Sequence, residues 1–125
     1  MLPRVSTSRR MTPIPSLDLR AFDALLAVPG VTAIDFTAKW CAPCRVMEPV
    51  LAALATEYTG RIRLAAIDVN DEPTVAERYN VRSMPTLVIL RDGREVGRVV
   101  GSRPRAFVAG MFDRALHGDV AIASP

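Results

Sequence analysis

The hydrophobic residues of this chain follow two spacings in turn, one typical of amphipathic helices and one typical of buried strands. The spacing changes several times after Thr12, and this order indicates helices that cover a sheet. We expect helices over residues 18–28, 45–59, 73–79 and 105–117, and strands over residues 31–36, 61–69, 86–90 and 95–100. Asp92-Gly93 joins the last two strands, which should therefore form an antiparallel hairpin.

Three positions depart from this pattern. Ile14 lies between Pro13 and Pro15, and because proline has no N–H to donate, a strand here should be short and lie at a sheet edge. Pro49 falls inside the second helix, where it should cause a kink. Asp35 lies in a strand that is otherwise apolar on both faces, so we expect its carboxylate to be buried.

Length and composition are those of one domain. The chain has 125 residues, of which 50% are hydrophobic, and this is enough to fill a single core. We expect the domain to span residues 12–118, between a disordered tail over residues 1–11 and a C-terminal tail over residues 119–125. No run approaches the ~20 apolar residues of a membrane helix, and the first residues lack the apolar stretch of a signal peptide. We therefore expect a cytoplasmic monomer without a membrane partner.

The charged residues give little support to nucleic acid as a partner. The formal net charge of +3 comes almost wholly from arginines, which are spread along the chain from Arg4 to Arg114. A nucleic-acid-binding surface needs a clustered basic stripe with aromatic residues among the charges, and only the short segment ending in Arg9-Arg10 is clustered. We interpret the basic residues as a solvated surface.

The two cysteines carry the candidate chemistry. Cys41 and Cys44 follow a buried strand directly and stand at the head of a helix. The unpaired N–H groups and partial positive charge of a helix N-terminus stabilise a thiolate, so Cys41 should be the nucleophile. Cys44, one turn further on, should then resolve the mixed disulfide. Asp35 ends the preceding strand and is the candidate base for the Cys44 thiol, with a pKa raised by burial.

Other interpretations of these residues remain. A lone buried aspartate is often a hydrogen-bonded structural residue, and this is the alternative for Asp35. A Cys-x-x-Cys pair can be half of a zinc site, but tetrahedral zinc needs four ligands and His117 is the only histidine. We expect no metal and no cofactor. His117 itself is explained by a favourable contact with a helix C-terminus.

Four blocks of the sequence resemble the thioredoxin family. They are Ile34-Asp35-Phe36, Trp40-Cys41-Ala42-Pro43-Cys44-Arg45, Met84-Pro85-Thr86-Leu87, and Asp92-Gly93 with Val100-Gly101. The resemblance runs from about Thr12 to His117. It implies an α/β thioredoxin fold, with a central mixed five-stranded sheet flanked by four helices. It also implies a thiol–disulfide oxidoreductase that reduces protein disulfides and is recharged by a flavin-dependent thioredoxin reductase.

The resemblance further implies a docking surface for disulfide substrates. Pro85 matches the family's cis-proline, which faces the cysteines, and Met84 offers backbone groups to an extended substrate segment. The residues of this surface would be Trp40, Ala42, Pro43, Met84, Pro85, Gly101 and Ser102. A flat apolar surface suits many partners. The alternative function is an interaction module that binds one dedicated partner, with incidental redox activity.

Three residues depart from the family pattern. Ala42 replaces the most frequent glycine between the cysteines, and this change can alter the redox potential. Thr37 replaces a frequent aromatic residue. Ala66 stands where a lysine usually neighbours the buried aspartate, so Asp35 should lack a nearby cation. We therefore expect Asp35 to have a higher pKa than is usual in the family, and to act as a base at higher pH.

Overall fold

The computed structural model describes residues 14–118. The expected tails over residues 1–11 and 119–125, and the first two residues of the expected domain, lie outside this part of the chain. In chain order the elements are α1 (Leu19–Leu26), β1 (Val31–Thr37), α2 (Ala42–Glu57), β2 (Ile62–Asp68), α3 (Pro73–Arg78), β3 (Thr86–Arg91), β4 (Arg94–Val100) and α4 (Arg105–Leu116). The predicted order of helices and strands after Asp18 is thus confirmed.

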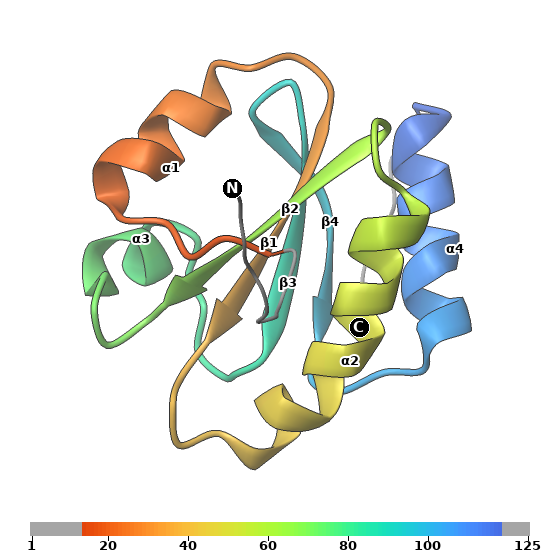
Figure 1. The fold of residues 1–125 in the computed structure, drawn as a ribbon. Helices are drawn as coiled ribbons and strands as arrows, with labels where there is room; N and C mark the ends of the chain where they lie inside the picture. Colours follow the sequence, from red (N-terminus) through yellow and green to blue (C-terminus); the bar gives the residue numbers. More distant parts are fainter. Residues whose placement is uncertain (1–13, 119–125) are drawn as a thin grey trace, which may run out of the picture.

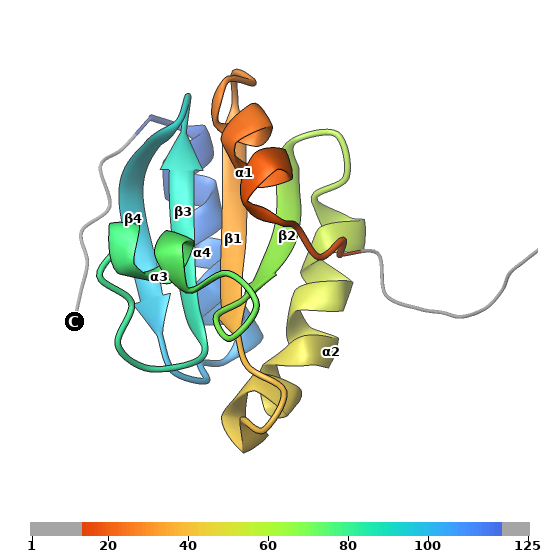
Figure 2. The same cartoon turned by 90° about the vertical axis from the view of Figure 1, so that its left-hand side faces the viewer.

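The strands form one mixed sheet in the order β2-β1-β3-β4. β1 is parallel to β2 and antiparallel to β3, and β3 pairs with β4 in the predicted antiparallel hairpin. Both turn residues of this hairpin have positive φ, +53° at Asp92 and +84° at Gly93, as a tight Asp-Gly turn requires. Helices α1 and α3 lie on one face of the sheet, and α2 and α4 lie on the other (Figures 1 and 2).

The expected five-stranded sheet has four strands within the described residues. In place of a fifth strand, the chain before α1 makes one isolated parallel bridge from Ser16 to Ala66, at the outer side of β2. The Ala66 N–H donates to the Pro15 carbonyl at 2.8 Å, and the Leu17 N–H donates to the Ala66 carbonyl at 2.8 Å. Pro15 itself has no N–H with which to continue the ladder, and this explains why the pairing stays short.

The core has two halves because β1 is buried on both faces. Its alternate residues point to opposite sides, with Val31 and Ala33 toward α2 and α4, and Ile34 and Phe36 toward α1 and α3. Asp35 has the same parity as Val31 and Ala33, so it faces the layer of α2 and α4. The larger half includes Met47, Leu51, Leu54, Tyr58, Leu87, Ile89, Val108 and Phe112. The other includes Phe22, Ile67, Val75, Val88 and Leu90.

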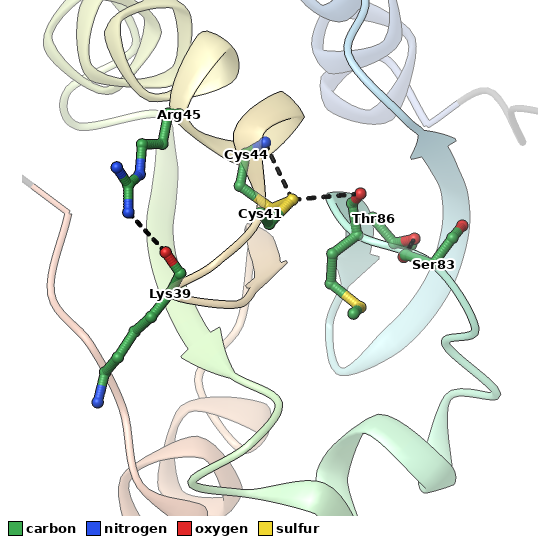
Figure 3. Close-up of a disulfide and its surroundings, with 7 residues drawn as sticks. Lys39, Cys41, Cys44, Arg45, Ser83 and Thr86 are labelled. Atoms are coloured by element: carbon green, nitrogen blue, oxygen red, sulfur yellow. Dashed lines mark hydrogen bonds between the residues drawn. A yellow bond between two sulfur atoms is a disulfide. The ribbon is translucent and has the colours of Figure 1, made fainter.

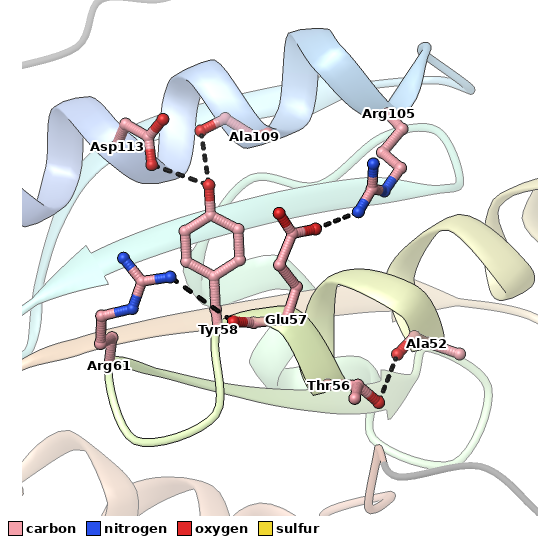
Figure 4. A network of polar contacts seen from close by, with 8 residues as sticks. All are labelled: Ala52, Thr56, Glu57, Tyr58, Arg61, Arg105, Ala109 and Asp113. Carbon is pink, nitrogen blue, oxygen red and sulfur yellow. Dashed lines mark hydrogen bonds and ion pairs between the residues drawn. The ribbon is translucent and has the colours of Figure 1, made fainter.

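Polar contacts connect α2 to α4 beside the larger half of the core (Figure 4). The Tyr58 hydroxyl donates to Asp113 Oδ1 at 2.7 Å, and its ring packs edge-to-face on Phe112 with centroids 5.3 Å apart. Burial, and then the contact with Asp113, raises the pKa of Tyr58 to about 12. Glu57 and Arg105 form an ion pair at the surface. These contacts fix α2, the helix that begins at the two cysteines.

Helix α2 begins earlier than predicted, at Ala42 and not at residue 45. Cys41 is its N-cap residue, and Pro43 lies in the first turn, where a missing N–H costs no helical hydrogen bond. Pro49 lies inside the helix without ending it. The two cysteines therefore belong to the start of the helix itself.

Candidate active site

Cys41 and Cys44 form a disulfide at the N-terminus of α2 (Figure 3). Their Cα atoms are 5.2 Å apart. The Cys44 backbone N–H donates to Cys41 Sγ at 3.1 Å, so the side chain of Cys41 caps the helix. Cys44 is 2% exposed, whereas Cys41 is partly exposed. An incoming disulfide can therefore reach Cys41, while Cys44 lies beneath it.

The segment before β3 lies against the disulfide. The Met84–Pro85 peptide bond is cis, as the resemblance implied for Pro85. Cys41 Sγ lies 3.4 Å from the Met84 carbonyl oxygen, which is the only link from this segment to the sulfur among the described hydrogen-bond contacts (Figure 3). The Thr86 hydroxyl donates to the Ser83 carbonyl at 2.7 Å and holds the turn.

The loop after β4 completes the surface around the disulfide. The Gly101 N–H donates to the Pro85 carbonyl at 2.8 Å, and the Arg103 N–H contacts Met47 Sδ at 3.4 Å. Trp40 is 89% exposed, and Ala42, Pro43 and Ser102 are also exposed. The structure thus brings Met84 to Cys41, and Gly101 is hydrogen-bonded to Pro85, the next residue in the chain after Met84. Of the exposed residues of the proposed docking surface, Trp40, Ala42 and Pro43 adjoin the cysteines in the chain, and Ser102 adjoins Gly101.

Asp35 lies in a cavity lined by residues of β1, β2 and α2. Asp35 is 7% exposed, and its Oδ1 has no hydrogen-bond partner within the part of the chain that the structure describes. In the register of the sheet Asp35 pairs with Ala66 of β2 and Leu87 of β3. Burial, and secondarily the charge of Glu48, raises the pKa of Asp35 from 3.8 to about 7. The predicted rise of this pKa is therefore confirmed.

The cavity itself has a volume of about 480 Å³. Its described lining residues are Ile14, Ser16, Asp35, Thr37, Glu48, Pro49, Leu51, Ala52 and Ala66. The methyl group of Ala66 is too short to fill the space opposite Asp35 or to bring a charge there. Among the described lining residues there is no cation, in agreement with the expectation drawn from Ala66.

Glu48 is a site residue that the sequence analysis did not identify. It follows Cys44 by four positions on α2, so the two side chains lie on the same face of the helix. Glu48 is exposed, yet it lines the cavity that contains Asp35. The signal available from the sequence was this four-residue spacing from Cys44.

Residues 14–118 contain neither a cluster of metal ligands nor a membrane-spanning helix. No group of three or more His, Cys, Asp or Glu side chains there is arranged to hold a metal ion. Nor is any of the described helices both long enough and apolar enough to cross a bilayer.

Comparison with known proteins shows the same similarity throughout the domain. Residues 14–113 match the family model described as thioredoxin. A thioredoxin of Staphylococcus aureus is 41% identical over 87 residues, which are 70% of this chain and 84% of the relative.

Solved structures agree with this match. The oxidized form of mitochondrial thioredoxin 3 from Saccharomyces cerevisiae is 36% identical, with a TM-score of 0.73, and the match covers 80% of this chain and 94% of that one. A thioredoxin from Nicotiana alata is 28% identical, with a TM-score of 0.78, and the match covers 87% of this chain and 97% of that one. The similarity therefore extends through the sheet, the helices and the cysteine segment.

Proposed function

Because this chain belongs to the thioredoxin family and is a protein-disulfide reductase, we propose a specific role for each residue of its site. The single observation that supports these roles best is the asymmetry of the cysteine pair. Cys41 is accessible and caps a helix, whereas Cys44, one turn further on, is buried.

In the first step the Cys41 thiolate attacks one sulfur of a substrate disulfide. The new S–S bond joins Cys41 to the substrate, and the other substrate sulfur leaves as a thiolate that takes up a proton. The Cys44 N–H, which points at Cys41 Sγ, and the end of the helix dipole stabilise the attacking thiolate. Trp40, Ala42, Pro43, Met84, Pro85, Gly101 and Ser102 dock the substrate segment.

In the second step Cys44 resolves the mixed disulfide. Its thiol gives a proton to the Asp35 carboxylate, and the resulting thiolate attacks Cys41 Sγ. The bond between Cys41 and the substrate breaks, and the second substrate sulfur leaves and is protonated. Two electrons have then passed to the substrate, whose two sulfurs take up protons from solvent, while Cys41 and Cys44 are oxidised to the disulfide seen in the structure.

The oxidised protein must be reduced again before the next cycle. We assign this step to a flavin-dependent thioredoxin reductase, whose reactive dithiol would attack the disulfide from the same exposed side as the substrate. Disulfide substrates and such a reductase are the partners that the family implies. A cytoplasmic location fits this role, because the cytosol keeps dithiols reduced.

Insulin reduction tests the assignment of Cys41. With dithiothreitol as reductant, the wild-type protein should accelerate cleavage of the insulin disulfides and the precipitation that follows. Cys41→Ser should show no rate above dithiothreitol alone, because serine cannot form the mixed disulfide. Full activity in this variant would contradict the assignment.

A trapping experiment distinguishes a general reductase from a module with one dedicated partner. Cys44→Ser should retain mixed disulfides with many proteins, because Cys41 can attack but the intermediate is not resolved. A variant with serine at both positions should retain none of them. If this double variant instead bound one partner as well as the wild type does, the interaction-module alternative would be supported.

A further inference from the structure

We infer that Glu48 is a positioning residue for the resolving step: through the shared cavity its charge controls how readily Asp35 accepts the Cys44 proton, and its side chain connects Asp35 to solvent. This inference rests on the proposed role of Asp35 as the base. It assigns a function to a residue that the reaction scheme above does not use.

The geometry places both carboxylates at one cavity with no competing charge. Asp35 lines the cavity from β1 and Glu48 lines it from α2. On the side of β2 the lining residue is Ala66, which has no charge. The buried Asp35 Oδ1 has no hydrogen-bond partner among the described residues, so the space in front of this atom is free for water. A buried carboxylate without donors holds a proton more strongly when a second negative charge faces the same space.

Glu48 also borders a second, smaller hollow. This hollow has a volume of about 230 Å³, and Glu48 and Thr37 line both spaces. The other charged residues around it are Lys39, Arg45 and Asp68. They come from the loop after β1, from α2 and from the end of β2. Glu48 therefore borders Asp35 in one hollow, and Lys39, Arg45 and the buried Asp68 in the other.

The chemistry requires a route for the proton once Cys44 has reacted. Asp35 holds this proton after the resolving step and must lose it before it can act as a base again. A chain of cavity water from Asp35 to the exposed Glu48 carboxylate would return the proton to solvent. Each cycle moves one proton from Cys44 to Asp35 and then outward, and Glu48 is unchanged at the end.

Rapid mixing of the reduced protein with 5,5′-dithiobis(2-nitrobenzoate) tests this role. Attack by Cys41 releases the first thionitrobenzoate, and attack by Cys44 on the mixed disulfide releases the second, so the two steps are separate absorbance phases. Glu48→Gln should change the second phase only. Glu77→Gln is the matched control, because Glu77 is an exposed carboxylate on α3, at the opposite face of the sheet.

In Glu48→Gln the rate of the second phase should rise below neutral pH and fall above it. If loss of the charge lowers the pKa of Asp35 from about 7 to about 6, its ionised fraction at pH 6 rises about fivefold. A weaker base is also less reactive, by about threefold for a Brønsted coefficient of about 0.5. The second phase should therefore become about twofold faster at pH 6 and about threefold slower at pH 8.

Three further measurements separate this role from a structural one. Glu48→Asp should restore the wild-type profile, and a carbon-13 titration of the Asp35 carboxyl should show a lower pKa in Glu48→Gln but not in Glu77→Gln. In an Asp35→Asn background, Glu48→Gln should have no further effect. A Glu48→Gln profile that superimposes on the wild type, or falls equally at both pH values, would overturn the inference. An unchanged profile in Asp35→Asn alone would instead refute the base role on which it rests.

Discussion

At the scale of single residues, the buried carboxylate of Asp35 makes the stability of the protein depend on pH. Its pKa is about 7 in the folded protein against an ordinary 3.8, so between these values the folded state holds a proton that the unfolded state has lost. The stabilisation of the folded state by this bound proton is therefore fully present below about pH 4, and it is lost as the pH rises through about 7. Above that pH the folded state contains a buried negative charge.

Asp35→Asn removes this charge while keeping the size of the side chain. Its stability advantage over the wild type should grow by roughly 3 kcal/mol between pH 5 and pH 8. Urea unfolding at the two pH values measures this difference. Asp71→Asn, at an exposed carboxylate, is the control. Its free energy of unfolding should differ from that of the wild type by the same amount at both pH values. A constant offset for Asp35→Asn as well would contradict a pKa raised by burial.

Residue-scale features differed in how far the sequence could predict them. The raised pKa of Asp35 was predictable, because an acid in an apolar strand must be desolvated and Ala66 offers no compensating cation. Glu48 was not predicted, because a helical pattern shows only that it lies on a polar face. Whether that face borders a cavity depends on Asp35 and Ala66 being paired in neighbouring strands, and this pairing is a property of the assembled sheet.

At the scale of elements, the hairpin between β3 and β4 is packed against the end of α1 through a glycine. A Cβ atom at Gly93 would lie 2.7 Å from the backbone oxygen of Leu26. Gly60 has a similar φ, +86° against +84°, but a Cβ there would meet nothing within 4 Å. The two glycines therefore separate the cost of backbone conformation from the cost of a steric clash.

Gly93→Ala should destabilise the protein more than Gly60→Ala. The second variant has only the strain of a left-handed backbone, about 1 kcal/mol. The first must also move the hairpin away from α1, which adds roughly 1–3 kcal/mol. Denaturant unfolding of both variants measures the difference. Equal losses would show that α1 and the hairpin are not in contact as described.

Element boundaries show where sequence patterns were insufficient. The apolar spacing predicts that α2 starts at residue 45, yet Ala42 and Pro43 already belong to the helix. Both positions are exposed, and the Cys41 cap that defines the start is a hydrogen bond. The residues around Ile14 predict a short edge strand, and the described chain makes one bridge there, from Ser16 to Ala66, with Pro15 unable to donate.

At the scale of the whole molecule, the two halves of the core should unfold together because they share β1. Phe22 packs edge-to-face on Tyr79 in one half, with ring centroids 5.7 Å apart, and Phe112 packs in the same way on Tyr58 in the other half. Phe22→Leu and Phe112→Leu should each cost about 1–2 kcal/mol and lower the midpoint of one common transition. Calorimetry that resolved two transitions in either variant would contradict this.

The bridge from Ser16 to Ala66 also limits strand pairing between two molecules at the edge of the sheet. β2 ends the sheet, and an open edge strand is a template on which a second chain can add a strand. At Ala66 both backbone groups are already bonded to Pro15 and Leu17 of the same molecule. An added strand would have to displace this segment, which also carries Ser16 into the cavity above Asp35. Intermolecular strand pairing, the first step toward a fibril, would therefore remove one wall of the cavity that contains Asp35.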